Sequence, residues 1–367
     1  MAVKLSLVVP CYNEESTLSE IVDKVLELKS ASLELEIIIV DDCSRDRSRE
    51  IATQLAARYP EVVLAAHEVN QGKGAALRTG FLKATGDFVG VQDADMEYDP
   101  KDYLLMLEPL LEGRADVVYG SRYLRPDTRR VLYFWHSRMN KFLTFASNMF
   151  TNLDITDMET CYKLFRREVI QEIAPKLREN RFGFEPEVTA YVAESNARVY
   201  ECAIHYNPRS YEEGKKIGWR DGVHALYCIM HYGACNAPLP MQILLYFFIG
   251  TVAALVNLGV FAILLNATTL GTDWSIVISY IASAAANYLL CIAVLFRHKA
   301  RWSTTGELFA YIVTLGIMGG IDYLLTLGLI RWLHAPVWGK LLASLVGFVG
   351  NFILRRKLVF PLRKRGK

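Results

Sequence analysis

VGVQDADMEYDP, residues 89–100, places four carboxylates directly after a short apolar run. The run over residues 88–91 has the composition of a buried strand. Asp93 and Asp95 share a face if strand geometry continues beyond the run, and Glu97 keeps the same parity. Carboxylate oxygens grouped in this way suit Mg²⁺ or Mn²⁺, which bind hard oxygen ligands together with phosphate. Solvated turn residues are the alternative interpretation, because aspartate is common in turns.

Two earlier stretches also end an apolar run in acidic residues. Strands are predicted over residues 5–9 and 35–40, followed by PCYNEE and DDCSRD, and further strands over 62–64 and 87–91. Helical spacing over residues 16–29, 46–58 and 74–84 separates these strands. Continuous β-branched runs that alternate with helices predict a mostly parallel, Rossmann-like α/β sheet covered on both faces. Ligands bind such sheets at the carboxyl ends of the strands, where the acidic stretches lie.

The side chains at these strand ends suit a nucleotide. Tyr12 can stack on a base, and Asp41 or Asp42 can accept hydrogen bonds from ribose hydroxyls or a base edge. NQGKGAALRTG, residues 70–80, sets Lys73 between two glycines where a helix is predicted to begin, and a helix N-terminus favours anions. A helix cap is the alternative explanation for these glycines. Neither a P-loop motif nor a dinucleotide-binding glycine motif in a strand–helix context occurs.

The apolar residues are distributed unevenly along the chain. They make up 52% of 367 residues, and the excess lies beyond residue 238. Stretches with few or no charges predict four transmembrane helices near 242–266, 274–296, 308–330 and 337–358, with buried helices of a soluble protein as the alternative. Basic residues cluster after the second and fourth stretches, so the positive-inside rule places both termini in the cytoplasm. No signal peptide is predicted.

Charge and cysteine content exclude other classes. The formal net charge is +2, which gives no case for nucleic-acid binding. The seven cysteines are scattered, odd in number and without a CxxC pair. This pattern predicts reduced thiols in the cytosol and does not predict a zinc site.

Several motifs together resemble one known family. VVPCYNEE, VDDCSRD, NQGKGAALRTG, DAD and GSRY (120–123) match family 2 glycosyltransferases of the GT-A fold in type, order and approximate spacing. The resemblance covers residues 1 to about 235 and is strongest to the dolichyl- and polyprenyl-phosphate sugar synthases. Residues 242–362 resemble the GtrA-like membrane domain. We therefore expect a cytoplasmic GT-A domain over 1–235 and an all-α, four-helix transmembrane domain over 236–367.

The resemblance implies metal-dependent, inverting transfer of a monosaccharide from a nucleotide-sugar to polyprenyl or dolichyl phosphate. GDP-mannose and UDP-glucose are the leading donors, with UDP-GlcNAc behind them, and Mg²⁺ or Mn²⁺ is the implied cofactor. The metal-binding motif matches Asp93, Asp95 and Glu97, although many relatives have glutamine where Glu97 stands. The predicted donor site comprises Pro10, Tyr12, Glu14, Asp41, Asp42, Lys73, Asp93, Ala94 and Asp95.

The resemblance also assigns an acceptor site. Arg122 matches an arginine that contacts phosphate, and Arg138 and Arg209 are candidates for two more, assisted by Lys215 or Lys216. Arginine suits this role because its planar fork binds phosphate through two N–H groups, whereas a surface or lipid-headgroup contact is the alternative for each. Asp157 occupies the place of an acidic residue near the acceptor, with a helix cap as its alternative. The predicted catalytic residues are Asp93, Asp95, Arg122, Arg138 and Asp157.

Three interpretations concern the surroundings of the site. Residues 131–150 are aromatic and basic, which suits a helix at the membrane interface or, alternatively, a buried core helix. Asp157, Glu159 and Glu185 are candidates to face the sugar, and the membrane domain is a candidate for homo-oligomer formation. The competing functions are a glycosyltransferase with a different acceptor and a lipid-linked sugar transporter or scaffold with an inactive GT-A half. The intact Asp93, Asp95 and Lys73 argue against the inactive form.

Overall fold

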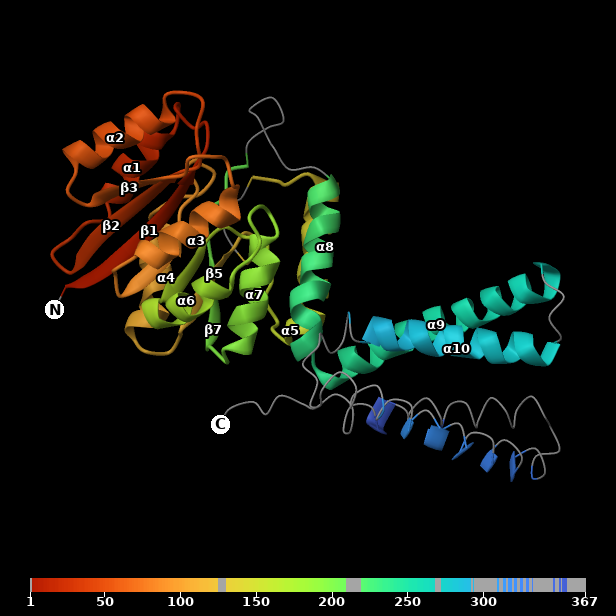
Figure 1. The fold of residues 1–367 in the computed structure, drawn as a ribbon. Coiled ribbons are helices and arrows are strands. Elements are labelled where there is room, and N and C mark those ends of the chain that lie inside the picture. The colour runs from red at the N-terminus through yellow and green to blue at the C-terminus, as the bar shows by residue number, and fades with distance from the viewer. Residues whose placement is uncertain are drawn as a thin grey trace. The chain divides into compact units, whose positions relative to one another are not determined.

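The computed structural model describes residues 2–124, 130–208, 219–267 and 272–291, residue 293, and isolated positions from 309 to 354. The chain divides into two compact units, Met1–Pro238 and Leu239–Lys367 (Figure 1). The strands of the first unit are β1 (Val3–Cys11), β2 (Leu33–Asp41), β3 (Val62–Ala66), β4 (Phe88–Val91), β5 (Val117–Ser121), β6 (Lys163–Arg166) and β7 (Val199–Ala203). Its helices are α1 (Leu18–Leu26), α2 (Ser48–Arg58), α3 (Lys73–Lys83), α4 (Asp102–Leu111), α5 (Phe134–Thr151), α6 (Arg167–Ile173), α7 (Phe184–Glu194) and α8 (Trp219–Gly233), with short 3₁₀ turns at Ala174–Lys176 and Ala234–Asn236.

The strands of the first unit form one mixed sheet in the order β3-β2-β1-β4-β6-β5-β7. The first four strands in this order are parallel, as predicted, because helices connect them. β6 runs antiparallel to both β4 and β5, and β7 returns to the parallel direction beside β5. The predicted α/β sheet is therefore confirmed as mostly parallel, with one reversed strand.

Helices cover both faces of this sheet because consecutive residues of β1 point in opposite directions. Val8 faces α3, where a Cβ on Gly80 would lie 2.1 Å from the Val8 side chain, so only glycine allows this approach. Leu7 lies on the opposite face, near Tyr103 of α4 and Gly90. Phe81 of α3 packs against Phe165 of β6 and Phe184 of α7, so α3, α6 and α7 share one face (Figure 1).

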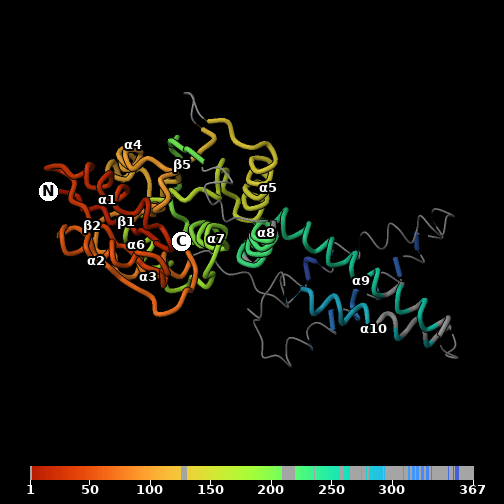
Figure 2. Tube along the Cα trace, turned by 90° about the horizontal axis from the view of Figure 1, so that it is seen from above, coloured from red at the N-terminus to blue at the C-terminus, as the bar shows by residue number. Residues whose placement is uncertain are grey.

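α5 and α8 pack together on the side of the first unit away from α1 and α2 (Figure 2). α7 also contacts both of these helices. These three helices therefore form a layer of their own beside the sheet.

A buried glutamate ties β1 and β2 to the turn before β4. Glu36 accepts hydrogen bonds from Ser6 Oγ at 2.5 Å, Lys4 Nζ at 3.1 Å and the Thr85 backbone N–H at 2.8 Å. Burial opposes the charge of Glu36, but these hydrogen bonds outweigh burial and lower the pKa of Glu36 to about 2.

We expect the Glu36→Gln variant to lose stability only where Glu36 is ionised. The depressed pKa contributes stability that is fully present above the ordinary value of 4.5 and is lost as pH falls through about 2. Near neutral pH the free energy of unfolding should fall by an amount on the order of 2 kcal/mol. The loss is no larger because the amide keeps an oxygen that accepts from Ser6. Urea unfolding of the wild type and the variant across this pH range measures the difference in their free energies of unfolding. An equal difference at all pH values would contradict the prediction.

The second unit begins with two packed helices, α9 (Leu239–Ala267) and α10 (Thr272–Leu290). The Ser283 hydroxyl of α10 donates to the Ala253 carbonyl oxygen of α9 at 2.7 Å. In the described part of the chain, one stretch is long and apolar enough to cross a membrane, Leu239–Val256 with a mean hydropathy of 2.0. The structure describes only scattered positions of the helices predicted near 308–330 and 337–358, so the four-helix domain stays a prediction.

Candidate active site

Three loops meet at the carboxyl ends of β1, β2 and β4, and each contains a residue in a strained backbone conformation. Asn13, Cys43 and Met96 have positive φ angles of 56°, 61° and 63°. A side chain at positive φ costs free energy, and such residues gather at functional sites where the surrounding structure holds them. The conformation is unfavourable above all for Cys43 and Met96, which lack the amide side chain that eases it for asparagine.

The first two loops carry most of the predicted donor residues. Pro10 and Asp41 stand at the paired ends of β1 and β2, and Tyr12 and Glu14 follow in the next loop. The Glu14 backbone N–H donates to Ser48 Oγ at 2.8 Å, which holds this loop against the start of α2. Asp41 is buried and accepts from the Ser44 backbone N–H at 3.3 Å. The structure therefore brings these predicted residues to one edge of the sheet.

Asp42 holds the loop before α3. Its carboxylate accepts from the backbone N–H groups of Gln71 at 2.9 Å and Gly72 at 2.6 Å, and it contacts His67 Nδ1 at 2.7 Å. Gly72 has a φ of 100°, and a Cβ there would lie 2.3 Å from the Asn180 carbonyl oxygen. Asp42 thus shapes the loop that presents Lys73, and a direct contact between Asp42 and a donor stays a prediction.

Lys73, the first residue of α3, bridges two carboxylates. Its Nζ lies 3.0 Å from the Asp93 carboxylate and 3.6 Å from Glu185 Oε1 of α7. Burial works against the Lys73 charge, but Asp93, Cys161 and Glu185 outweigh it and raise the pKa of Lys73 well above its ordinary value. Lys73 is therefore a permanent cation beside the acidic loop. Ala94, in the same loop as Asp93, is buried.

Asp95 and Glu97 lie in the tight turn after β4. The Glu97 backbone N–H donates to Asp95 Oδ1 at 3.2 Å, and the Tyr206 hydroxyl donates to Glu97 Oε2 at 2.9 Å. Oxygen ligands from Asp93 and Asp95 fit a hard divalent cation, because both side chains are partly exposed on one short loop. Glu97 already has a protein partner in Tyr206, so its predicted role as a metal ligand stays a prediction.

Arg122 and Asp157 form a buried, bidentate ion pair. Arg122 Nε and Nη2 each lie 2.7 Å from an Asp157 oxygen, and the Arg122 backbone N–H donates to the same carboxylate at 3.1 Å. The Arg122 guanidinium also lies over the Tyr206 ring, 5.1 Å from its centroid. The structure describes the whole segment from the end of α5 at Thr151 to the start of β6 at Lys163, and no helix begins there, so the alternative of a helix cap for Asp157 is wrong.

Two further carboxylates, Glu159 and Glu185, each have a buried oxygen atom. Burial, followed by repulsion from Glu185, raises the pKa of Glu159 to about 8. Glu159 Oε1 and Glu185 Oε2 have no hydrogen-bond partner among the residues that the structure describes. Lys163 is fully buried, donates to the Met158 carbonyl oxygen at 3.0 Å, and has its pKa lowered by burial. Glu159 and Glu185 therefore offer acceptor oxygens close to the buried amine of Lys163.

Sequence reasoning missed Tyr206 and Lys163. Tyr206 pairs with Tyr98 through an isolated antiparallel bridge, and it contacts both Glu97 and Arg122. Its only sequence signal was an aromatic residue before NPRS, a stretch chosen for its arginine. Lys163 follows the Asp157–Glu159 stretch and gave no signal beyond its charge.

The predicted acceptor residues are only partly covered. Arg138 is exposed on α5, with its guanidinium 5.0 Å from the centroid of the Phe134 ring. Arg209 and Lys215 lie outside the described residues. We call Phe134, Trp135, Met139, Phe142 and Phe145 the aromatic face of α5, because these side chains are all more than half exposed while Leu143, Ser147 and Phe150 are buried.

Comparison with known proteins identifies the family. A family model described as glycosyl transferase family 2 matches residues 6–174, which include the three loops, Arg122 and Asp157. An undecaprenyl-phosphate 4-deoxy-4-formamido-L-arabinose transferase of Pseudomonas fluorescens is 30% identical over 277 residues, 74% of this chain and 75% of that protein. The chain belongs to glycosyl transferase family 2. The resemblance seen in the sequence is therefore confirmed.

Other similarities extend beyond the family 2 region. A model described as the GtrA/DPMS transmembrane domain matches residues 245–360 and indicates a membrane protein. A dolichyl-phosphate beta-glucosyltransferase of Trichomonas vaginalis is 30% identical over 220 residues, 56% of this chain and just under two thirds, 66%, of that relative. A crystal structure of glucosyl-3-phosphoglycerate synthase from Mycobacterium tuberculosis with uridine diphosphate has a TM-score of 0.50 at 16% identity, covering 64% of this chain and 81% of that one. This likeness concerns the fold alone.

Proposed function

We propose that this family 2 protein transfers a monosaccharide from a nucleotide-sugar to a polyprenyl or dolichyl phosphate at the cytoplasmic surface of a membrane. The observation that carries the proposal is the cluster of Lys73, Asp93, Asp95 and Arg122, which places carboxylates and cations at one edge of the sheet. A nucleoside diphosphate needs both a cation site and a permanent positive charge. The names of the relatives, which include lipid-phosphate sugar transferases, support the acceptor class.

On the donor side, each residue has a physical task. Tyr12 stacks on the base and Asp41 accepts from the ribose or the base edge, while Lys73 stabilises the diphosphate charge. Asp93 and Asp95 would hold Mg²⁺ or Mn²⁺, which supplies charge neutralisation for a departing diphosphate. Glu159 Oε1 and Glu185 Oε2, which have no hydrogen-bond partner within the described part of the chain, can accept hydrogen bonds from sugar hydroxyls. Such bonds would satisfy acceptors that are otherwise costly to bury.

On the acceptor side, positioning is the main requirement. A lipid phosphate is already anionic near neutral pH, so it needs no strong general base. Arg122, oriented by Asp157, and Arg138 would hold the phosphate in line with the anomeric carbon, with Arg209 and Lys215 as further candidates. A phosphate oxygen forms a bond to that carbon as the bond to the diphosphate breaks, and its electron pair leaves with the nucleoside diphosphate. The anomeric configuration inverts.

The membrane arrangement completes the proposal. Four helices in the second unit would anchor the protein with both termini in the cytoplasm, and the aromatic face of α5 would bring the site to the lipid surface. Contacts between the second units of neighbouring chains would give a homo-oligomer.

Parallel donor assays test the function. The purified full chain in lipid receives Mn²⁺ or Mg²⁺, a short polyprenyl phosphate, and radiolabelled GDP-mannose, UDP-glucose or UDP-GlcNAc in separate reactions. We expect label from one donor to enter the lipid phase and transfer to stop when EDTA removes the metal. Tight nucleotide binding without transfer from any donor would instead favour another acceptor or an inactive scaffold.

The aromatic face of α5 makes a separate prediction. Trp135 is 79% exposed. Changing Trp135 to glutamate should raise the KM for lipid phosphate about tenfold, because the variant loses roughly the burial energy of one large apolar side chain. Initial rates in liposomes measure the KM of each substrate. Leu111→Glu is the control, since Leu111 is 54% exposed at the end of α4, and an equal rise in the nucleotide KM would contradict the prediction.

A further inference from the structure

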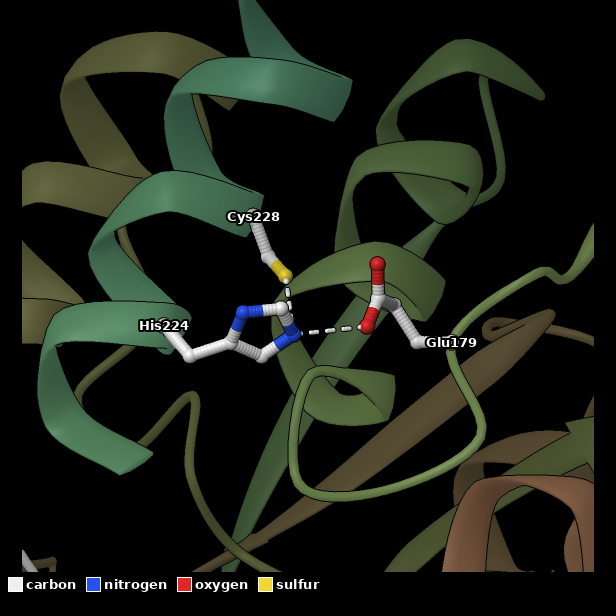
Figure 3. A group of neighbouring side chains, drawn as sticks. All are labelled: Glu179, His224 and Cys228. Atoms are coloured by element: carbon white, nitrogen blue, oxygen red, sulfur yellow. Dashed lines mark hydrogen bonds and ion pairs between the residues drawn. The ribbon is translucent and has the colours of Figure 1, made fainter. Parts of the chain in front are cut away.

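Three potential metal ligands that do not belong to the cluster of Lys73, Asp93, Asp95 and Arg122 converge on one another. Glu179 precedes α7, and His224 and Cys228 lie one turn apart on the same face of α8 (Figure 3). His224 Nε2 lies 2.8 Å from Glu179 Oε2 and 3.5 Å from Cys228 Sγ. The three ligand atoms lie within 4.8 Å of one another, so oxygen, nitrogen and sulfur surround a single point.

These separations are close to those of a tetrahedral zinc site. Zinc bonds to sulfur of about 2.3 Å and to nitrogen of about 2.0 Å place two such ligands roughly 3.5 Å apart. The observed separation of His224 and Cys228 is 3.5 Å. The carboxylate and imidazole would have to separate by about half an ångström from their hydrogen-bonded distance. His224 is exposed on α8, with its ring stacked on Tyr227.

The surroundings support the three ligands. Cys228 is fully buried, Glu179 is partly buried and His224 faces solvent, which leaves an entry side and a position for water. The Tyr232 hydroxyl donates to Glu179 Oε1 at 2.9 Å and orients the carboxylate, as the outer partners of metal ligands do. A Cβ at position 183 would lie 2.6 Å from Glu179 Oε2 and 2.7 Å from Cys228 Sγ, so Gly183 makes room for the cluster.

We propose that Glu179, His224 and Cys228 bind one zinc ion or a similar transition-metal dication per chain. The thiolate and imidazole favour such an ion over Mg²⁺, which distinguishes this site from the oxygen ligands of Asp93 and Asp95. The Cys228 thiol releases its proton to solvent as the metal–sulfur bond forms. The alternative is a hydrogen-bond network in which His224 and Cys228 both donate to Glu179.

The site would clamp α8 to the segment that supports the donor loop. Asn180, next to Glu179, accepts from the Ala75 backbone N–H at 3.3 Å and from Arg78 Nη2 at 2.9 Å. Both partners belong to α3, which begins with Lys73. An occupied site therefore fixes α8 against the first turns of α3. The metal site itself does not depend on the proposed sugar transfer.

Sequence analysis predicted no zinc site because it considered cysteine pairs. The ligands instead combine one cysteine and one histidine at helical spacing with a glutamate 45 residues before His224, a distance that only the fold closes.

Cobalt binding tests the proposal with a readout that does not depend on activity. The full chain in detergent is stripped with a chelator, supplied with excess Mg²⁺ and titrated with Co²⁺. We expect a thiolate-to-cobalt charge-transfer absorption that saturates at one ion per chain and disappears when Zn²⁺ displaces cobalt. Zn²⁺ should also raise the unfolding temperature of the stripped protein.

Two ligand variants and one control make the result specific. Cys228→Ser should remove the charge-transfer absorption, and His224→Gln, a change at an exposed position, should weaken Co²⁺ binding without unfolding the protein. Cys202→Ser, at a partly exposed cysteine of β7, should change neither the charge-transfer absorption nor the affinity for Co²⁺. Circular dichroism checks each fold. Absence of the absorption in the wild-type chain, or its persistence in Cys228→Ser, would show that the three residues form only a hydrogen-bond network.

Discussion

Changing Asp95 to asparagine is expected to reduce sugar transfer about 10³-fold, since a metal that neutralises a leaving group contributes several kcal/mol to transition-state stabilisation. The amide keeps an oxygen that accepts from the Glu97 backbone N–H, as Asp95 does at 3.2 Å, so the turn after β4 should persist. The loss should therefore appear in the rate and in metal dependence, with little effect on stability. Single-turnover assays with the preferred donor, over a range of Mn²⁺ concentrations, measure both.

Asp99→Asn is the matched control for Asp95. Asp99 belongs to the same acidic stretch, and its oxygen accepts from the Lys101 backbone N–H at 3.0 Å, a contact that asparagine preserves. Transfer by this variant should stay within about threefold of wild type, because an exposed local hydrogen bond of this kind contributes little to the reaction itself. If both variants lost the same activity, the charge of the whole stretch would matter and a specific metal ligand at Asp95 would be excluded.

Changing Asp157 to alanine is expected to destabilise the first unit by about 3–5 kcal/mol, because it strands a buried guanidinium without its partner. Arg122 and Asp157 have side-chain exposures of 8% and 0%, so water cannot replace the lost carboxylate. The stability of Asp157→Asn should lie between those of the wild type and Asp157→Ala, since one acceptor oxygen remains. Urea unfolding of the full chain, followed by circular dichroism, measures the order of the three proteins.

An exposed pair and a double variant separate stability from function. Glu50 pairs with Arg47 at exposures of 55% and 70%, so Glu50→Ala should change stability by less than about 1 kcal/mol. Replacing both Arg122 and Asp157 by leucine should restore much of the stability, because apolar side chains often substitute for a buried ion pair. The double variant should still fail to transfer sugar. Recovery of activity along with stability would contradict a phosphate-binding role for Arg122.

The first half of the fold was predictable because its signals are local. Buried β-branched runs predicted β1 to β4 within a few residues, and helical spacing predicted α1 to α3 between them. The reversed strand β6 was not predicted, since its four residues gain their place only by pairing with β4 and β5. Strand direction in such a short segment depends on long-range contacts that no local pattern records.

The site was predictable as a set of residues and not as a set of pairs. Asp93, Lys73, Arg122 and Asp157 were all recognised from motifs, yet the partners of each lie 20 or 35 residues away in the chain. Asp41 and Asp42 are neighbours of identical chemistry, and the sequence did not separate them. The backbone of Gly72 decides between them, because it draws the Asp42 carboxylate into the loop before α3.

The contact between Lys73 and Asp93 gives the Asp93 carboxylate a counter-ion from within the protein. The ammonium group lies 3.0 Å from the Asp93 carboxylate that a divalent cation would also use. A cation arriving alone must displace Lys73 and leave it without a full partner, whereas a cation arriving with a diphosphate offers Lys73 a new anion. We therefore expect metal and nucleotide to bind with positive cooperativity, each raising the affinity of the other by the same factor. Lys73 would thus lower the affinity of the site for metal until a nucleotide is also bound.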